Sequence, residues 1–250
     1  MSAYDYPLYY EIAFSYQEVK RQVDFFQTVA KRFCGKEARR FLDIGRGPSP
    51  QLREIARRGY EAVGLDTNSK MVEYLNQKAI EEGLRIETVQ TDMRDFKVAK
   101  KCDFAFSLSG SMKVDSNQEF LRHLSCVANA LNDGGIYLLE NEALEIGLRS
   151  GRQEWSMKSE EIEIKVTYEM TMLDFIEQIS EGKLILDVVD HGERKRLVSV
   201  ERSKDFAPQE LKSLVELSGC FKFLGFFKHL SLEPLRENFN DNIVLMQKRG

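Results

Sequence analysis

The sequence predicts an α/β fold built on a mostly parallel β-sheet with helices on both faces, together with an antiparallel β insertion. Strand-like and helical segments alternate from residue 38 to residue 140, a pattern typical of parallel strands joined by crossover helices. Between residues 161 and 202 the alternation stops, and four strand-like segments follow one another with no helix between them. Antiparallel strands can be joined by short hairpins, so this second pattern predicts a separate antiparallel unit.

The alternating part of the chain carries helix and strand signals in a regular order. Apolar residues recur at helical spacing over residues 15–33, which predicts a first helix. Gly59 and Gly83 are expected to end two later helices, and the Gly134–Gly135 pair a third. The predicted strands are 38–45, 60–66, 84–90, 102–109 and 136–140, and the helices between them are 49–59, 68–83 and 118–135.

The insertion is expected over residues 144–205, inside a single domain that spans residues 1–250. The polar stretches SEGK (180–183) and DHGER (190–194) predict hairpin loops. After the insertion, a helix at 208–219 and two closing strands complete the α/β unit. The strand-like segments of the insertion are 161–170, 172–180, 183–190 and 197–202, and the closing strands are 221–227 and 242–248.

Composition narrows the possible partners. The chain has 250 residues, 42% of them hydrophobic and 30% charged, with a net charge of −4. This charge gives no broad electrostatic reason to expect binding to nucleic acid or to an anionic membrane. The four cysteines form no CxxC pair, so we expect reduced thiols and no metal site. The N-terminus has no signal-peptide pattern, and no apolar run approaches the roughly 20 residues that span a bilayer, so we expect a cytoplasmic protein.

The segment FLDIGRGPSP (41–50) predicts a ligand-binding loop at the end of the first strand of the sheet. Asp43, Asp66 and Asp92 fall at successive strand ends, and ligands of open parallel sheets bind at these carboxyl ends. A nicotinamide dinucleotide could use Asp66 for its ribose. However, the third glycine of that fingerprint falls at Pro50, and Asp43 would repel a pyrophosphate.

A cationic cofactor without phosphate fits the same three aspartates better. S-adenosylmethionine carries a sulfonium and an α-ammonium group, which favour a carboxylate such as Asp43. Asp66 can accept hydrogen bonds from both ribose hydroxyls, and Asp92 can accept one from the adenine amine. The alternative is that the acids are helix caps or turn residues, which would explain each one singly.

These motifs resemble those of the class I S-adenosylmethionine-dependent methyltransferases, whose fold is a seven-stranded, Rossmann-like sheet. LDIGRGPSP is similar to the glycine-rich first motif, AVGLDTNSKMV to the second, and QTDMRDF to the adenine-contacting segment. LNDGGIYLLE matches the turn and strand that follow, so the resemblance covers residues 38–140. It implies cofactor contacts from Asp43, Gly45, Arg46, Gly47, Ser49, Asp66, Thr67, Met71, Asp92, Met93 and Leu108.

The tyrosine-rich N-terminus and the insertion resemble small-molecule methyltransferases in particular. Among these are the glycine and sarcosine N-methyltransferases and the nucleotide-sugar N,N-dimethyltransferases. The resemblance implies methyl transfer to a small polar metabolite, with N-methylation slightly favoured over O-methylation and the insertion as a substrate-side cap. A protein side-chain methyltransferase and a catalytically silent cofactor-binding or scaffold module are the alternatives, and both a monomer and a homodimer stay open.

Two positions depart from the family pattern. Arg46 stands where a small residue is usual, and it could bind the cofactor carboxylate, pair with an acid or crowd the pocket. Pro48 and Pro50 remove backbone donors from the loop. We expect the Ser49 hydroxyl to substitute for the missing donors.

The acceptor side of the pocket is expected to come from the N-terminus, from the SLSGSMK loop (107–113) and from the insertion. Of the N-terminal tyrosines, one or two either cover the cofactor and contact the acceptor or only pack on the sheet. The loop offers polar side chains close to the point of methyl delivery. These candidates are Tyr6, Tyr9, Tyr10 and Tyr16, with Ser109, Ser111 and Lys113 from the loop.

No general base stands out in the sequence. Tyr10, Ser109 and His191 are weak catalytic candidates. His123 falls on a predicted helix, where a structural role is expected, and His191 falls in a predicted hairpin turn, where exposure to solvent is the simpler expectation. His229 carries no signal.

Overall fold

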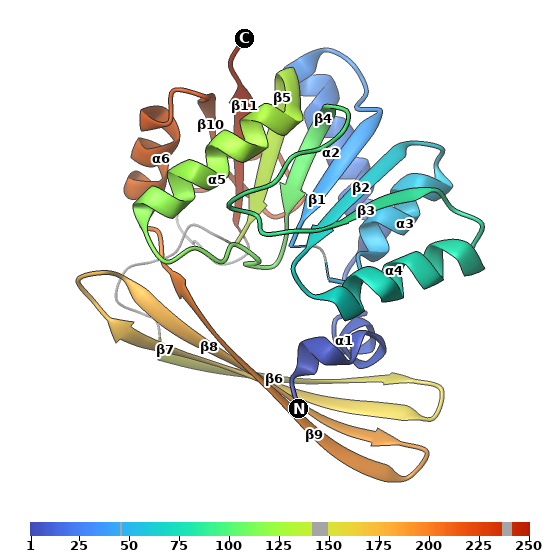
Figure 1. Cartoon of the computed structure of the whole chain (residues 1–250). Helices are drawn as coiled ribbons and strands as arrows, with labels where there is room; N and C mark the ends of the chain where they lie inside the picture. Colours follow the sequence, from blue (N-terminus) through green and yellow to red (C-terminus); the bar gives the residue numbers. More distant parts are fainter. Residues whose placement is uncertain (46, 142–149, 237–241) are drawn as a thin grey trace.

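The computed structural model describes residues 1–45, 47–141, 150–236 and 242–250. It consists of a seven-stranded α/β unit and a separate four-stranded antiparallel sheet that lies across one end of it (Figure 1). Among the described residues, no helix is both long and apolar enough to cross a membrane. All four cysteines are free thiols.

The large sheet confirms the predicted α/β class. Its strand order is β10-β11-β5-β4-β1-β2-β3, and β11 runs antiparallel to both of its neighbours while the other pairs are parallel. Chain order reverses at β1, which pairs with β2 on one side and β4 on the other, so a ligand site is expected beside β1. The strands are β1 (Arg40–Ile44), β2 (Glu61–Asp66), β3 (Ile86–Gln90), β4 (Cys102–Ser107), β5 (Leu131–Glu140), β10 (Phe221–Lys228) and β11 (Asn242–Lys248).

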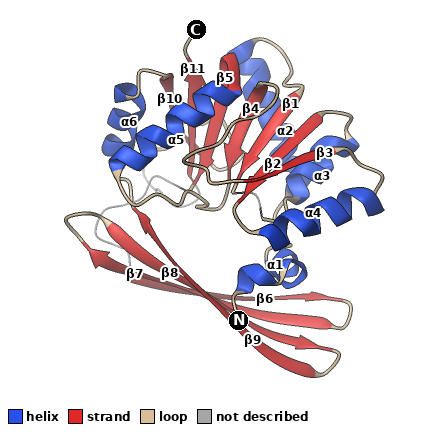
Figure 2. Cartoon of the chain, in the orientation of Figure 1, coloured by secondary structure: helices blue, strands red, loops and turns tan. Residues whose placement is uncertain are grey.

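Helices cover both faces of this sheet and create two hydrophobic cores (Figure 2). On one face, α5 (Asn117–Ala130) and α6 (Pro208–Leu217) pack their apolar stripes against the strands. The opposite face is covered by α2 (Val19–Cys34), α3 (Pro50–Arg57) and α4 (Ser69–Glu81). Gly59 and Gly83 follow α3 and α4 with positive φ angles of 82° and 66°, as expected for helix stops.

One predicted helix end is wrong. The helix expected over 118–135 ends at Ala130, and the Gly134–Gly135 pair lies inside β5. A Cβ on Gly135 would lie 2.8 Å from the carbonyl oxygen of Asn132 and 3.1 Å from that of Asp103. The pair therefore allows backbones to approach closely at the start of a strand, which a helix-stop interpretation misses.

The antiparallel sheet has the order β6-β7-β8-β9, but its hairpins differ from those expected. The expected SEGK loop lies within β8, and the β7–β8 turn comes earlier, where Asp174 Oδ1 accepts 2.9 Å hydrogen bonds from the amides of Ile176 and Glu177. The DHGER turn is confirmed. The strands are β6 (Ser150–Ser159), β7 (Ile162–Asp174), β8 (Ile179–Asp190) and β9 (Glu193–Lys204).

The N-terminal segment lies between the two sheets (Figure 1). A short 3₁₀ helix, η1 (Ala3–Asp5), leads into α1 (Pro7–Ala13), which begins with proline at a position where its missing amide costs nothing. Apolar side chains of α1 pack on the inner face of the four-stranded sheet. Trp155 of β6 donates a 2.7 Å hydrogen bond from Nε1 to the carbonyl of Ala13, which fixes the end of α1 to the sheet.

Candidate active site

One cavity of about 1100 Å³ opens at the carboxyl ends of the parallel strands and reaches the four-stranded sheet. It brings together every described position in the predicted cofactor set. Arg46 lies outside the described residues. The ten positions that line the cavity are Asp43, Gly45, Gly47, Ser49, Asp66, Thr67, Met71, Asp92, Met93 and Leu108.

Neither Gly45 nor Gly47, in the loop after β1, could be replaced by a residue with a side chain without a clash or backbone strain. Gly45 has a φ of 69°, and a Cβ there would lie 3.2 Å from Cβ of Ser111 and 3.4 Å from Cε of Met93. Gly47 has a φ of 52°, and its Cβ would lie 3.6 Å from the Tyr10 ring. Both glycines adopt a left-handed conformation that other residues rarely take. The loop is therefore shaped for close approach of a ligand to its backbone.

Asp43, at the end of β1, accepts a hydrogen bond from its own loop, which the sequence did not predict. The residue is 3% exposed, and its Oδ2 accepts a 2.5 Å hydrogen bond from the Ser49 hydroxyl. The same Ser49 oxygen accepts a 3.2 Å bond from the Leu52 amide and caps α3. Ser49 is fully buried and its one hydroxyl hydrogen goes to Asp43, which corrects the expectation that this hydroxyl replaces the missing loop donors.

Pro50 is explained by the same helix start. It occupies the first turn of α3, where the amide would have had no partner within the helix. The proline at the third position of the glycine motif thus begins a helix that Ser49 caps.

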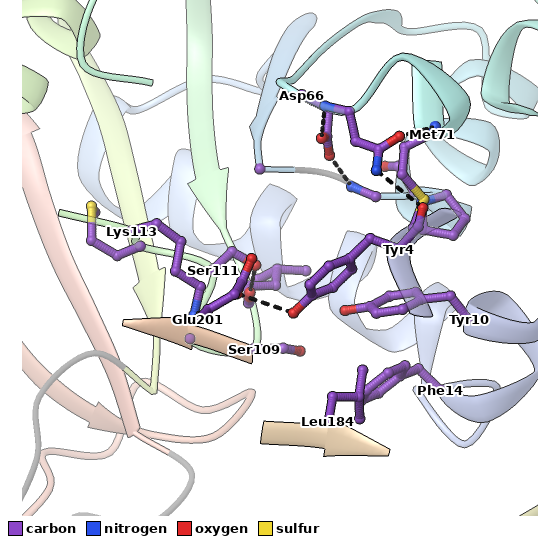
Figure 3. Close-up of a pocket in the computed structure, with 18 of the residues that line it drawn as sticks. Tyr4, Tyr10, Phe14, Asp66, Met71, Ser109, Ser111, Lys113, Leu184 and Glu201 are labelled. Carbon is purple, nitrogen blue, oxygen red and sulfur yellow. Dashed lines mark hydrogen bonds and ion pairs between the residues drawn. The ribbon is translucent and has the colours of Figure 1, made fainter. Parts of the chain in front are cut away.

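Asp66, at the end of β2, joins the first two loops of the site. Its Oδ2 accepts a 2.8 Å hydrogen bond from the Gly47 amide, and its Oδ1 accepts a 2.9 Å bond from the Asn68 amide. Each carboxylate oxygen has a second lone pair that can accept from a ligand hydroxyl. Asp66 faces the cavity from the cofactor side, beside Met71 (Figure 3).

Asp92, beyond β3, is paired with an arginine that the sequence reasoning missed. Arg94 donates from Nε to Asp92 Oδ1 at 2.9 Å and from Nη2 to Oδ2 at 2.7 Å, and its Nη1 also binds Glu119. These bonds hold the pKa of Asp92 below its usual range. The signal was present in the sequence, since Arg94 stands two residues after Asp92 in QTDMRDF.

The N-terminal tyrosines divide into two groups. Tyr10 and Tyr16 line the cavity, as does Tyr4, which the sequence reasoning did not single out. The rings of Tyr4 and Tyr10 lie 5.6 Å apart between centroids. Tyr9 instead donates a 2.7 Å hydrogen bond to Asp190, and Tyr6 stacks on it, so these two pack between α1 and the sheet.

The loop after β4 is held by a buried glutamate at the end of β5. Glu140 is 4% exposed, and its Oε2 accepts a 2.9 Å hydrogen bond from the Ser109 amide. Its Oε1 lies 3.0 Å from Nε2 of His229. Ser109 and Ser111 line the cavity, but the Ser111 hydroxyl donates to the carbonyl of Leu108 at 2.5 Å. Glu140 positions this loop, and no local motif marked it in the sequence.

The surroundings of two histidines indicate the role of each. His123 is fully buried, with Nδ1 2.9 Å from the Met93 carbonyl oxygen and Nε2 2.7 Å from the Tyr137 hydroxyl. Burial lowers its pKa to about 4, so it is a neutral structural residue, as expected. His191 lies at the exposed tip of the β8–β9 hairpin beside Asp190 and does not line the cavity. The structure therefore removes His191 from the catalytic candidates.

The four-stranded sheet supplies the second half of the cavity wall, and most of these residues were not predicted. Glu201 of β9 is central among them. Its Oε2 accepts a 3.0 Å hydrogen bond from the Tyr4 hydroxyl and lies 3.3 Å from Nζ of Lys113 (Figure 3). The lining residues from this sheet and the segment after it are Gln153, Trp155, Tyr168, Met170, Gly182, Leu184, Glu201, Ser203, Lys204 and Asp205.

Comparisons with known proteins agree with this arrangement. Residues 41–135 match a family model described as a methyltransferase domain. No curated protein sequence matches the chain significantly. Among solved structures, an S-adenosylmethionine-dependent methyltransferase from Clostridium acetobutylicum aligns over 97% of both chains, with 14% identity and a TM-score of 0.81.

Two further solved structures are described by the group they modify. The alignment with a sugar N-methyltransferase from a Streptoalloteichus species covers 98% of this chain and 93% of that protein, with 16% identity and a TM-score of 0.75. The alignment with an amino pentose methyltransferase from Micromonospora echinaspora covers 93% of this chain and 92% of that protein, with 14% identity and a TM-score of 0.71. Residues 41–135 thus match a methyltransferase domain, and the chain as a whole shares the fold of solved S-adenosylmethionine-dependent methyltransferases.

Proposed function

We propose that the enzyme binds S-adenosylmethionine beside β1 and β2 and transfers its methyl group to an amino group of a small polar metabolite. The observation that supports this most strongly is the convergence of ten predicted cofactor positions on one cavity. That cavity also reaches the inner face of the four-stranded sheet, and about 1100 Å³ is enough for a nucleoside-sized cofactor and a small acceptor.

The strand-end half of the cavity fits this cofactor. Gly45 and Gly47 leave their backbone open to a ligand, because a side chain at either position would enter occupied space or strain the loop. Asp43 and Asp66 place carboxylates where a cationic, phosphate-free ligand is favoured. When bound, S-adenosylmethionine supplies a methyl group activated by its attachment to a positively charged sulfur.

N-methylation is favoured over O-methylation because it asks less of the residues in the cavity. A hydroxyl acceptor needs a general base, whereas a neutral amine already has a free lone pair. Among the described residues that line the cavity there is no histidine. The sugar N-methyltransferase and the amino pentose methyltransferase noted above share the fold, which supports a nitrogen on a small polar molecule as the acceptor.

We assign the acceptor to the side of the cavity formed by α1 and the four-stranded sheet. The insertion, residues 144–205, would then be a substrate-side cap within a single domain. Trp155, Tyr168 and Glu201 project from three of its strands into the cavity wall. Tyr10 of α1 lies at the junction, since its ring covers Gly47 and also lies beside Tyr4.

Incubation with S-adenosylmethionine carrying a labelled methyl group, in an extract separated afterwards into protein and small molecules, tests this function. We expect the label in a basic small molecule. Label in protein would support the protein side-chain methyltransferase instead. Binding of S-adenosylhomocysteine without any transfer of label would support a silent cofactor-binding module.

A further inference from the structure

Glu201 brings a carboxylate into an aromatic part of the cavity. Tyr4 and Tyr10 approach from the N-terminal segment, and Tyr168 comes from β7. Gly182 pairs with Glu201 across β8 and β9, and a Cβ on Gly182 would lie 2.7 Å from the Tyr168 hydroxyl. The glycine therefore leaves room for the Tyr168 ring next to Glu201. A carboxylate among tyrosine rings is the combination that binds ammonium groups, through charge and through cation–π attraction.

A primary ammonium already lies at this carboxylate. Nζ of Lys113 is 3.3 Å from Oε2 of Glu201, and the two side chains are 37% and 34% exposed. A half-exposed ion pair of this kind contributes little to stability, and lysine is flexible enough to leave it. Lys113 belongs to the loop after β4, which lines the same cavity as the predicted cofactor positions. Its ammonium thus occupies a place that an amine acceptor could take.

We propose that Glu201 is the specificity-determining residue of the acceptor site, accepting a hydrogen bond from the acceptor amino group where Nζ of Lys113 now lies. The inference rests on the proposed function and adds the residue that selects an amine. Tyr4 keeps Glu201 in place through its 3.0 Å hydrogen bond, and Tyr10 and Tyr168 flank the amine. A hydroxyl group in the same place would gain less, because it carries no positive charge for Glu201 to stabilise.

Glu201 would also favour the reaction itself. An acceptor that binds as an ammonium first releases one proton to water, which frees the nitrogen lone pair. The neutral nitrogen then forms the new bond to the methyl carbon while the carbon–sulfur bond breaks, and that bond's electron pair stays on sulfur. The nitrogen becomes positively charged as this happens and afterwards releases a proton to water. A carboxylate fixed beside the nitrogen stabilises the charge that develops, and its hydrogen bond aims the lone pair at the methyl group.

The single tryptophan of the chain makes direct binding measurable. Trp155 lines the same cavity, so its fluorescence reports an acceptor-side ligand. The probes are D-glucosamine and 3-amino-3-deoxy-D-glucose, each of which differs from D-glucose by one amino group in place of a hydroxyl. At pH 7, with S-adenosylhomocysteine bound, we expect at least one amino sugar to bind about tenfold more tightly than glucose, the scale of a charge-assisted hydrogen bond.

Two variants and one matched control decide the role of Glu201. Glu201→Gln should abolish the preference for the amino sugar, while Tyr4 can still donate to the amide oxygen and hold the fold. Lys113→Met should tighten amino-sugar binding, since it removes the competing ammonium. Glu181→Gln is the control, because Glu181 precedes Gly182 on β8 and pairs with Arg202 at 3.3 Å without lining the cavity. It should leave the preference unchanged.

The outcomes separate this inference from the proposed function. Equal binding of glucose and both amino sugars, a preference that survives in Glu201→Gln, or unchanged or weaker binding in Lys113→Met would each overturn the inference. Each of these would leave cofactor binding intact, as a calorimetric titration with S-adenosylhomocysteine checks. Failure of wild-type protein to bind S-adenosylhomocysteine would instead overturn the proposed function.

Discussion

The two halves of the cavity are built in different ways. The cofactor half consists of short loops at adjacent strand ends, where Asp43, Gly45 and Gly47 lie within five residues of sequence. The acceptor half is assembled from alternate residues of long antiparallel strands, so Tyr168, Gly182 and Glu201 are neighbours in space through strand pairing. The cofactor half can be recognised in the sequence because its residues follow one another in short loops. The acceptor half cannot, because the pairing register of the strands decides which residues meet.

Replacing Asp66 tests the cofactor half with the largest expected effect. Asp66→Ala removes an acceptor for the ribose hydroxyls and the partner of the Gly47 amide, so we expect S-adenosylhomocysteine to bind more weakly by about 1–3 kcal/mol. Calorimetry measures this change. The preference for an amino sugar over glucose should persist, because Glu201 lies in the other half. Unchanged affinity would remove Asp66 from the ribose site.

The cofactor half also rests on a buried histidine, which makes it sensitive to acid. The pKa of His123 is about 4 in the folded protein, against about 6.5 in an unfolded chain. The unfolded state binds the proton first, so stability falls as the pH drops from about 6.5 to about 4. We expect His123 to contribute a loss of about 2 kcal/mol between pH 7 and pH 5.

Urea denaturation of wild type and of His123→Gln at these two pH values measures that contribution. The variant is less stable throughout, but its free energy of unfolding should fall less between pH 7 and pH 5. An identical fall in both proteins would contradict the assignment of His123 as a neutral buried residue.

Tyr10 belongs to both halves of the cavity. Its ring covers Gly47 on the cofactor side and lies beside Tyr4 on the acceptor side. Tyr10→Ala should therefore weaken S-adenosylhomocysteine and amino-sugar binding together, by about 1 kcal/mol each. Tyr10→Phe, which keeps the ring, is the matched control and should retain both affinities. A loss confined to one ligand would place Tyr10 wholly in that half.

Replacing Gly182 should have the smallest effect on ligand binding, and it tests whether the two halves act independently. Gly182→Ala places a methyl group 2.7 Å from the Tyr168 hydroxyl, but the end of that side chain can move aside. We expect less than about 1 kcal/mol of lost amino-sugar affinity and no change for S-adenosylhomocysteine. Weakened binding of S-adenosylhomocysteine would show that the two halves are coupled through the sheet.

The accuracy of the sequence predictions follows the same division. The α/β fold was predicted because apolar strands, helix-stop glycines and strand-end acids are local signals, and the cofactor positions converge for that reason. Strand β6 was missed because SGRQEWSMKS shows no apolar alternation, and its pairing with β7 holds it in the sheet. SEGK looked like a turn because it contains glycine, but Gly182 serves the Tyr168 ring instead.

Residues that act through long-range contacts were the hardest to find. Glu140 holds Ser109 from the end of a different strand, and Glu201 meets Tyr4 across 197 positions of sequence. Nothing near either glutamate in the sequence indicates its partner. Arg46 lies outside the described residues, so its role stays a sequence prediction. Tighter cofactor binding in Arg46→Ala would indicate crowding, and weaker binding would indicate a carboxylate contact.

The most direct test of the central claim is a calorimetric titration of the purified protein with S-adenosylhomocysteine and, separately, with NADH. We expect one-to-one binding of S-adenosylhomocysteine and no binding of NADH, because Asp43 stands directly before the loop that would have to hold a pyrophosphate. Binding of NADH without binding of S-adenosylhomocysteine would contradict it.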